Sequence, residues 1–529
     1  MFREAPAGKF QENAFKTAAC YLTEEVSKRW IELLGTDAER KEDPGTDGNG
    51  PDAATSCAGD LTNPIIDREP PAADFVLLLD NTGRESVDLH ASFKSIGASF
   101  FSCVINDDGF APDGIESVYG YFLGYPEGKE HPGKPRYFNR IEVPGYWEIS
   151  GTGRGGRITD MSHERARIFY AEPAHKRYVK IVDWIDGSGI VRSSDHYNKN
   201  GCLFARTAFN SKGERVNRSY FSKDGNEIIV ENFVTKDIIL NFDRQVRMFK
   251  NKTELVIFYL EKRKLDDKRI FYNSLSYPFF VSEDLKGRGR GDILFWQEEI
   301  KDDIPGNMQI ILGGRSACTE SIAVQKRRAY DKMAALKADM GMVRLLGFVY
   351  PFARPNRYTR EILICTNSDN IACLSEITER LSSFRFHIAA LTEMSSKLMA
   401  YGDRKNVILY PGVSMGKLDE LFDRCDLYLD INHENEIVSA VRRAFLNNML
   451  ILAFRETLHD GVYVEDSHIF SEAEPEGLIA FAGALAGNGR AGGEYMETGL
   501  MDKELVDREL ARQREHALCA EEDMYRQII

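Results

Sequence analysis

The sequence lacks the marks of several protein classes. Its nine cysteines are an odd number and include no C-x-x-C pair. This pattern indicates neither a disulfide framework nor a zinc site, and it favours free thiols in a reducing compartment. No apolar run reaches the ~18 residues of a membrane helix, and residues 1–30 contain no apolar signal core. These absences predict a cytoplasmic protein, for which peripheral contact with a membrane stays open.

An excess of basic residues is also missing. Asp and Glu number 82 against 68 Lys and Arg, which gives a formal net charge of −14. Sequence-independent binding to nucleic acid needs many Lys and Arg side chains facing phosphates, so a nucleic-acid partner is not expected. The 529 residues, 43% of them hydrophobic, are enough for about three domains at roughly 100–200 residues each.

The N-terminal part of the chain differs from the rest in composition. Residues 37–73 are rich in Pro, Gly, Asp and Ala. Such a segment cannot bury enough apolar surface to offset the entropy lost on ordering. It is predicted to be a flexible linker after an N-terminal appendage at residues 1–36.

A β-α-β pattern then begins. FVLLLD at 75–80 and FFSCVI at 100–105 read as buried strands, and residues 85–97 between them read as an amphipathic helix. This order predicts a parallel sheet with helices on its faces. Residues 74–136 are therefore assigned to the first part of a Rossmann-like domain.

Between residues 137 and 241 the pattern changes. Gly189, Gly201, Gly213 and Gly225 recur every twelve residues, and glycine tolerates the positive φ of tight hairpin turns. Short alternating runs between them predict an up-and-down antiparallel meander inserted in the first domain. Its inward face is expected to carry five aromatic residues: Trp147, Tyr170, Trp184, Phe204 and Phe209.

The βα pattern returns at residues 242–345, which complete the first domain. Strands are predicted at 254–260, 292–298 and 308–314, followed by a helix at 320–340.

A second Rossmann-like domain is predicted at residues 346–500, with a strand at 361–366 and a helix at 370–384. The charged residues 501–529 are predicted to form a C-terminal helix that packs across both domains.

Several phrases of the sequence resemble the GtfB family: NDDGF, YFNRIEVPGYWEI, ENFVTKDIILNF, DILFWQE, TNSDN and DLYLDINHENEI. The resemblance extends from about Phe75 to His459. It implies an α/β fold, a GT-B-like pair of Rossmann-like domains with an antiparallel β-meander inserted in the first. It also implies the stabilising, substrate-binding subunit of the O-linked N-acetylglucosaminyltransferase of the accessory Sec system.

The implied partners are a catalytic GtfA-like subunit, in a hetero-oligomer, and a serine-rich repeat adhesin that the pair glycosylates. The meander around Gly189, Gly201, Gly213 and Gly225 is the expected contact with the catalytic subunit, because an open sheet edge can pair with another chain. The alternative is a lid that packs only on its own domain.

The segment at 426–445, DLYLDINHENEIVSAVRRAF, reads as the strand, loop and helix that hold a donor sugar nucleotide in many two-domain glycosyltransferases. The usual second Glu is missing there: Glu434 is followed eight residues later by Arg442, and Glu436 by Ala444. Metal-independent enzymes of this architecture usually place an Arg and a Lys after the first strand of the second domain. No Arg or Lys follows Cys365 here before Arg380.

These departures predict no catalytic residue and no cofactor, and the absence of any Asp-x-Asp pair argues against a metal. A transferase must stabilise the negative charge that develops on the leaving phosphates. The alternative is an active retaining GT-B transferase that uses UDP-N-acetylglucosamine with another cation, for which Arg315, Arg442 or Arg443 could serve.

Polar residues at the carboxyl ends of strands form the candidate acceptor or glycan site, since ligands of doubly wound sheets bind there. Their amides, hydroxyls and carboxylates can pair with peptide and sugar groups. The alternative is that they cap helices, as Asn367 or Ser368 could for a helix from Asn370. The candidates are Thr366, Asn367, Ser368, Asp369, Asn432, His433, Glu434 and Asn435.

Overall fold

The computed structural model describes residues 71–125, 133–285, 290–487, 490–491, 494–495 and 500–529. The chain separates into two units, Met1–Asp60 and Leu61–Ile529, and all described residues lie in the second. The predicted appendage at 1–36 and all but the last three residues of the predicted linker at 37–73 lie outside the described residues.

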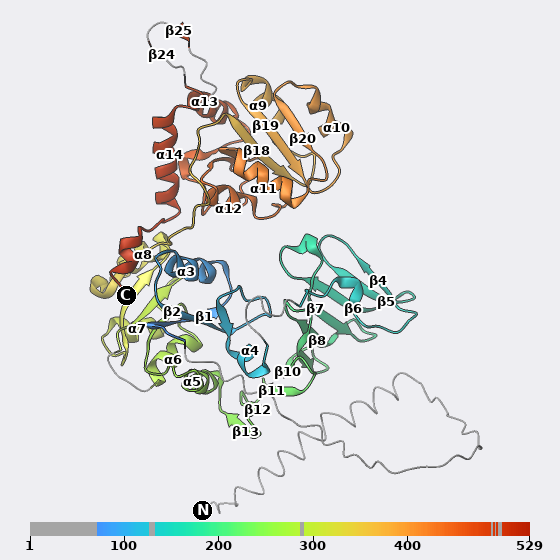
Figure 1. The fold of residues 1–529 in the computed structure, drawn as a ribbon, viewed down its shortest axis with the longest axis vertical. Helices are drawn as coiled ribbons and strands as arrows, with labels where there is room; N and C mark the ends of the chain where they lie inside the picture. The colour runs from blue at the N-terminus through green and yellow to red at the C-terminus, as the bar shows by residue number, and fades with distance from the viewer. Residues whose placement is uncertain (1–70, 126–132, 286–289, 488–489, 492–493, 496–499) are drawn as a thin grey trace, which may run out of the picture. The chain divides into compact units, whose positions relative to one another are not determined.

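A seven-stranded parallel sheet forms the first layered part (Figure 1), with strand order β17-β16-β15-β14-β1-β2-β3. The strands are β1 (Phe75–Asn81), β2 (Phe100–Asn106), β3 (Ile115–Ser117), β14 (Arg269–Tyr272), β15 (Asp292–Trp296), β16 (Thr319–Val324) and β17 (Val343–Leu345). The helices are α3 (Arg84–Ser95), α4 (Val118–Leu123), α5 (Lys252–Arg263), α6 (Tyr277–Asp284), α7 (Gly306–Leu312) and α8 (Arg327–Ala335).

Three predictions in this part are wrong. Residues 254–260 lie in helix α5, and 308–314 lie largely in helix α7. The predicted helix at 320–340 is the strand β16 followed by α8. A short apolar run does not distinguish a buried strand from a buried helix. In α5 the side chain of Asn251 accepts a hydrogen bond from the Glu254 amide at 3.1 Å, and this cap starts a helix.

The ten strands β4 to β13 follow one another in a single antiparallel sheet, in the order of the sequence. They are β4 (Glu148–Gly151), β5 (Gly156–Asp160), β6 (His163–Tyr170), β7 (Val179–Ile185), β8 (Val191–Tyr197), β9 (Leu203–Phe209), β10 (Arg215–Phe221), β11 (Glu227–Asn232), β12 (Ile238–Phe242) and β13 (Gln245–Phe249). The meander thus runs past residue 241 to Phe249.

The periodic glycines of the meander occupy its turns. Gly189, Gly201, Gly213 and Gly225 have φ values of 78°, 79°, 78° and 81°, a region that side chains with a Cβ disfavour. Each glycine lies between two consecutive strands from β7 to β11. The twelve-residue spacing therefore predicted the hairpins correctly.

The predicted aromatic core of the meander is divided. Tyr170, Trp147 and Trp184 belong to one cluster with the first strands. Phe204 instead packs in the cluster that covers one face of the seven-stranded sheet, together with α4 and α5. Phe209 belongs to neither cluster. The two halves of the meander therefore bury different apolar surfaces.

A six-stranded parallel sheet forms the second layered part, with strand order β20-β19-β18-β21-β22-β23. The strands are β18 (Glu361–Thr366), β19 (Arg385–Ala390), β20 (Val407–Tyr410), β21 (Leu427–Asp430), β22 (Leu450–Phe454) and β23 (Ile469–Phe470). The helices are α9 (Leu374–Arg380), α10 (Ser396–Met399), α11 (Met415–Arg424), α12 (Ala440–Leu446) and α13 (Glu476–Leu485). Two short strands, β24 (Arg490–Ala491) and β25 (Glu494–Tyr495), pair with each other.

The C-terminal segment is two helices rather than one, α14 (Lys503–His516) and α15 (Glu522–Arg526). Gln513 of α14 accepts a hydrogen bond from the Ile451 amide of β22 at 2.9 Å. Tyr525 of α15 donates its hydroxyl to the Gly347 carbonyl at 2.8 Å and packs edge-on against Phe93 of α3. The segment therefore contacts elements of both parallel sheets, as expected.

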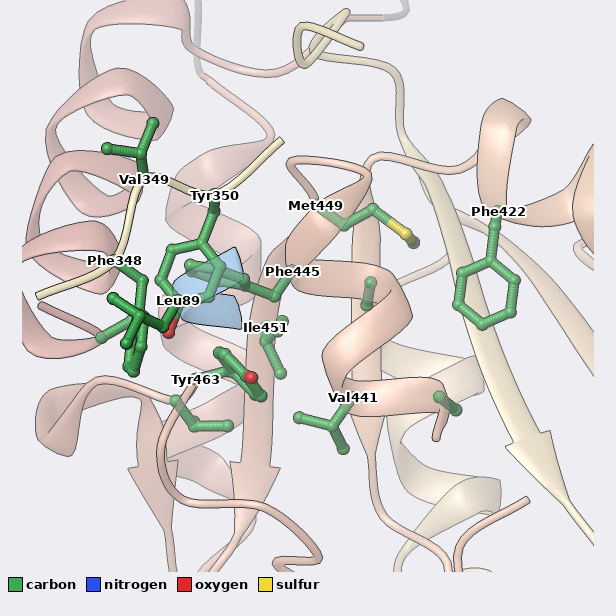
Figure 2. Packing of buried hydrophobic residues seen from close by; sticks show 14 of the residues in the cluster. Leu89, Phe348, Val349, Tyr350, Phe422, Val441, Phe445, Met449, Ile451 and Tyr463 are labelled. Atoms are coloured by element: carbon green, nitrogen blue, oxygen red, sulfur yellow. The ribbon is translucent and has the colours of Figure 1, made fainter. Parts of the chain in front are cut away.

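One buried cluster contains residues of both layered parts. Figure 2 shows Leu89 of α3 and Tyr350 close to Phe445 of α12 and Tyr463. The Tyr350 and Phe445 rings meet edge to face at 5.0 Å between centroids. Apolar burial of this kind is the main favourable term in folding, so the two parts share one core.

Within the described ranges, no helix is both long and apolar enough to cross a lipid bilayer.

Candidate functional site

The candidate residues follow two neighbouring strands at the centre of the six-stranded sheet. β18 and β21 pair in parallel, and the strand order reverses between them. In doubly wound sheets ligands bind outside the carboxyl ends of the strands at this point. Thr366 is the last residue of β18, and Asn432 comes two residues after β21.

Thr366 and Asn432 form a buried hydrogen-bonded pair. The Thr366 hydroxyl donates to Asn432 Oδ1 at 2.7 Å, and both residues are almost fully buried. The Ser368 amide donates to Thr366 Oγ1 at 3.1 Å, and the Asn432 Nδ2 group donates to the Glu434 carbonyl at 3.0 Å. The structure thus brings these predicted residues together, and their polar groups largely satisfy one another.

Backbone bonds hold the two loops together. The Ala372 amide donates to the Ile431 carbonyl at 2.8 Å, and the His433 amide donates to the Asn370 carbonyl at 3.1 Å. The alternative in which Asn367 or Ser368 caps a helix from Asn370 is wrong, because α9 begins at Leu374 with no side-chain cap. Ser368 Oγ instead accepts from the Asn370 amide at 3.1 Å, a turn within the loop.

The remaining candidates differ in exposure and partners. Asn367 Oδ1 is buried without a hydrogen-bond partner among the described residues. Asp369 accepts from the Ser395 hydroxyl at 2.9 Å. His433 lies 2.9 Å from the Glu472 carboxylate. Glu434 and Asn435 are exposed, so this side of the site is open to solvent.

His459 is a residue of the site that the sequence did not reveal. Its Nδ1 lies 2.6 Å from Asp430 Oδ1, and its Nε2 lies 2.6 Å from the Glu434 carbonyl oxygen. The hydrogen bond to Asp430 is the main reason why the pKa of His459 rises to about 9. The imidazolium therefore donates to both partners at neutral pH and fixes the loop after β21. The available signal was Asp430, an acid at the end of an apolar strand.

Helix α12 carries the position at which donor-binding enzymes place their second acid, and Glu436 precedes this helix. Glu436 Oε1 accepts from the Val441 amide at 2.8 Å, and burial raises the pKa of this carboxyl group. The arginine that replaces the usual second acid is Arg442. It forms a salt bridge with Asp88 of α3 and donates its Nε–H to the Tyr463 hydroxyl at 3.2 Å.

The other two arginines proposed as substitute cations, Arg443 and Arg315, are also poorly placed to bind a donor phosphate. Arg443 pairs with Asp419, and its guanidinium lies 4.2 Å from the centroid of the Phe422 ring. Arg315 comes between α7 and the first residue of β16, at the amino edge of the seven-stranded sheet. Ligands of such sheets bind at the opposite edge.

The carboxyl edge of the seven-stranded sheet carries a network of amide side chains that the sequence analysis missed. Asn273 after β14 donates to Gln297 Oε1 at 2.9 Å, and Gln297 after β15 donates to Gln325 Oε1 at 2.8 Å. Gln325 after β16 reaches the Tyr525 hydroxyl at 3.2 Å. All three amides are buried. The sequence offered little signal, because only Gln297 lies at a predicted strand; no strand was predicted directly before Asn273, and Gln325 fell in the predicted helix at 320–340.

The described residues contain no group of three or more His, Cys, Asp or Glu side chains arranged to hold a metal ion.

Four family models match the chain in sequence order. They are the GtfB N-terminal domain at residues 76–122, the GtfB middle domain at 147–250, the GtfB third domain at 252–336 and the GftB/GlyA-F C-terminal domain at 362–497.

Full-length relatives match as well. The UDP-N-acetylglucosamine–peptide N-acetylglucosaminyltransferase stabilizing protein GtfB of Streptococcus gordonii is 44% identical over 408 residues, which are 77% of this chain and 90% of the relative. The protein of the same name from Streptococcus agalactiae is 44% identical over 415 residues, 78% of this chain and 93% of the relative. A chain in the crystal structure of a GtfA/B complex bound to UDP and GlcNAc superposes with a TM-score of 0.78 at 41% identity, covering 86% of this chain and 99% of that chain.

Proposed function

Because the chain belongs to the GtfB family of stabilizing proteins, we propose that it is the non-catalytic subunit of a protein O-N-acetylglucosaminyltransferase. In this proposal its two parallel sheets form a GT-B-like pair. It stabilises a catalytic GtfA-like subunit in a hetero-oligomer and binds the serine-rich repeat adhesin that is glycosylated. It acts in the cytoplasm, at or near the membrane face from which the accessory Sec system exports the adhesin.

The observation that carries the proposal is the state of Arg442. Transfer from a nucleotide sugar requires a cation that can neutralise the departing diphosphate. Arg442 is the cation nearest to the expected donor position in sequence, and its guanidinium is held by Asp88 and Tyr463. An arginine whose charge is already neutralised by a buried carboxylate is a poor partner for a phosphate.

The site at β18 and β21 is better suited to a neutral polar ligand. Its groups are hydroxyls and amides, and the buried Asn367 Oδ1 can accept a hydrogen bond from a peptide N–H, a serine hydroxyl or a sugar hydroxyl. A buried acceptor without a partner raises the energy of the unbound state, so a ligand that donates to it gains affinity. This supports acceptor binding by Thr366, Asn367, Ser368, Asp369, Asn432, His433, Glu434 and Asn435.

An activity assay tests the catalytic part of the proposal. The chain alone, the GtfA-like subunit alone and the mixture are each given UDP-N-acetylglucosamine and a serine-rich peptide. We expect transfer by the mixture and none by this chain alone. Turnover by the chain alone that a substitution in its own β18–β21 site abolishes would overturn the proposal in favour of an active transferase.

A pair of matched variants tests acceptor binding. Asn367→Ala removes the buried acceptor, whereas Asn370→Ala changes an exposed residue of the same loop. Loss of one hydrogen bond to an uncharged partner is expected to weaken binding of the serine-rich peptide roughly five- to tenfold. The control should bind like the parent chain. Equal affinities of all three proteins in a calorimetric titration would remove the site from the proposal.

The meander is proposed as the contact with the catalytic subunit. The turns at Gly189, Gly213 and Gly225 have open space around the glycine, whereas Gly201 lies against Lys134 of the same chain. Two of the three open turns, those at Gly189 and Gly213, lie at the same end of the antiparallel sheet, because both lead from an odd-numbered to an even-numbered strand. This end is the part of the meander that we expect to meet the partner.

Bulky modification tests the expected contact. A maleimide-polyethylene glycol on Ser211→Cys, beside Gly213, is expected to block capture of the GtfA-like subunit. The same group on Asp224→Cys, at the turn on the opposite end, is the matched control. Capture that is equally efficient after both modifications would favour a meander that packs only on its own chain.

A further inference from the structure

Two salt bridges join the two layered parts beside their shared core. Arg84, the first residue of α3, pairs with Asp460 of the 459–463 loop, which follows β22. Asp88, one turn further along α3, pairs with Arg442 of α12. Helix α3 belongs to the seven-stranded sheet, whereas α12 and the 459–463 loop belong to the six-stranded sheet. Both salt bridges therefore cross from one part of the chain to the other.

Each part supplies one acid and one arginine to this exchange. The Asp88 side chain is 4% exposed and that of Asp460 is 11% exposed, so both carboxylates are largely removed from water. A buried carboxylate without its cation is strongly destabilising. A small shift between the two parts would leave one such acid on each side before water can replace the lost partner. The pairs therefore resist this shift more than ordinary surface salt bridges do.

Tyr463, at the end of the 459–463 loop, connects the two salt bridges. Its hydroxyl accepts a hydrogen bond from Arg442 Nε at 3.2 Å, and the guanidinium carbon of Arg84 lies 5.8 Å from the centroid of its ring. The same ring lies 4.7 Å from that of Phe445 between centroids, within the shared core. The salt bridges and the apolar contact between the two parts thus form one continuous interface.

Helix α3 is fixed at both ends on its own side of this interface. Near its start, the Ser86 hydroxyl accepts a hydrogen bond from Asn273 Nδ2 at 2.8 Å. Near its end, Ser92 Oγ accepts from the amide of Val349 at 2.9 Å, and Val349 lies in the segment that leads from β17 to β18. A shift of the 459–463 loop would therefore be transmitted to the first part as a whole, because α3 cannot move alone.

The start of the 459–463 loop contacts the β18–β21 site. His459 Nδ1 lies 2.6 Å from Asp430 Oδ1, and the His459 amide donates to Asp430 Oδ2 at 2.8 Å. His459 Nε2 lies 2.6 Å from the Glu434 carbonyl oxygen, which also accepts from Asn432 Nδ2 at 3.0 Å. Since His459 directly precedes Asp460, a ligand that moves residues 432–435 also disturbs the loop that holds Arg84.

We propose that the two salt bridges and Tyr463 form a latch that holds the two parallel sheets at one angle, and that His459 makes the latch respond to the β18–β21 site. A ligand that donates to the Glu434 carbonyl competes with His459 and loosens the 459–463 loop. The parts then move about residues 346–350 and 518–520, where the Phe348 amide donates to the Leu518 carbonyl at 3.0 Å. The nature of this ligand, a serine-rich acceptor, rests on the proposed function.

The distance between the two parts in the full-length chain tests the latch. Glu298 after β15 and Glu393 after β19 are exposed, one in each part. Both are replaced by p-acetylphenylalanine and spin-labelled through its ketone, because the nine native cysteines rule out a thiol label. Double electron–electron resonance then gives the distribution of distances. We expect a single narrow distribution for the parent.

Arg84→Met opens one salt bridge of the latch. Lys326→Met is the matched control, since Lys326 pairs with Glu85 of the same helix at 3.7 Å but within the first part. We expect Arg84→Met to raise the population at other distances about fivefold or more, and the control to match the parent. Exchanging the charges, with Arg84→Asp and Asp460→Arg together, should restore the narrow distribution, which general loss of stability does not explain.

His459→Ala tests the link to the β18–β21 site without a ligand. It should broaden the distribution as well, and its combination with Arg84→Met should have less than the summed effect, because both act through one loop. If Arg84→Met does not fold, as its melting curve would show, Asp460→Asn takes its place. A broad distribution in the parent, parent-like distances in Arg84→Met or equal broadening in Lys326→Met would overturn the latch. Parent-like distances in His459→Ala would overturn its link to the site.

A serine-rich peptide separates this inference from the proposed function. Coupling between two sites is reciprocal, so the peptide should broaden the distribution of the parent, and Arg84→Met should bind the peptide more tightly. Peptide binding without either effect refutes only the link between latch and site. If the parent binds no peptide while Arg84→Met still broadens the distribution, the latch stands and acceptor binding in the proposed function is refuted.

Discussion

Replacing Arg442 by methionine removes one half of the salt bridge between α12 and α3. The Asp88 side chain is 4% exposed and that of Arg442 27%, so the substitution leaves a buried carboxylate without its main partner. Breaking such a pair typically costs about 3–5 kcal/mol. Arg84 also lowers the pKa of Asp88 and compensates part of the loss, which brings the expected cost to about 2–3 kcal/mol.

Arg443→Met on the same helix is the matched control. Its partner Asp419 is 66% exposed, and salt bridges of this kind are worth about 0–1 kcal/mol. The assay is thermal unfolding followed by circular dichroism. We expect Arg442→Met to lower the melting temperature by roughly 4 °C or more, from the usual shift of about 2–4 °C per kcal/mol in domains of about 150–250 residues, and Arg443→Met to change it by much less.

The pH dependence of the loss identifies its cause. Burial raises the pKa of Asp88, and Arg442 pulls it back down, so removing Arg442 raises that pKa further. A carboxyl group whose pKa is raised in the folded state destabilises the protein above that pKa. The effect disappears at low pH, where the carboxyl group is protonated in both the folded and the unfolded state. The loss should therefore be larger at pH 8 than at pH 5, and Asp88→Asn in the Arg442→Met background should restore part of it. Equal losses at both pH values, or an equal loss in the control, would refute the reasoning.

Two further substitutions probe the β18–β21 site. His459→Gln should flatten the decline of stability with rising pH. A histidine whose pKa is raised from 6.5 to about 9 stabilises the fold below pH 6.5 and loses this effect as the pH rises through 9. Melting temperatures measured between pH 6 and 10 test this, and a slope like that of the parent protein would contradict it. Thr366→Val leaves Asn432 Oδ1 with only the distant Ser368 hydroxyl at 3.5 Å and should cost about 1–3 kcal/mol in denaturant unfolding. Thr392→Val, at a less buried threonine after β19, should cost less.

Local periodicity was enough to predict the meander and the strands that position the candidate site. The glycine spacing determined the hairpins because each turn needs a positive φ. Thr366 and Asn432 could be placed together because carboxyl ends of adjacent parallel strands lie at one edge. The type of some elements could not be predicted, because α5 and α7 are short apolar runs and period alone does not separate such helices from strands.

Long-range pairs could not be predicted. Arg442 and Asp88 are 354 residues apart in the chain, and no local pattern indicates that they meet. Arg442 was considered as a substitute cation because its position in the segment suggested it, whereas its role depends on what α3 places opposite it. The same limit applies to a pocket between the meander and the carboxyl end of β2, whose lining residues run from Ile105 to Lys252 in the sequence.

The two parallel sheets share one chemical feature at the point where their strand order reverses. Thr366 and Asn432 meet beside β18 and β21, and Asn273 accepts the Asp80 amide between β14 and β1 at 2.9 Å. Both places use neutral hydrogen-bonding groups, and beside β18 and β21 an active transferase would need positive charge for a diphosphate. Neutral groups still orient a polypeptide or a sugar, because these ligands are recognised through hydroxyls and amides. Catalysis at this site would therefore require cations at the β18–β21 edge together with release of Arg442 from Asp88, since a single substitution leaves one of the two conditions unmet.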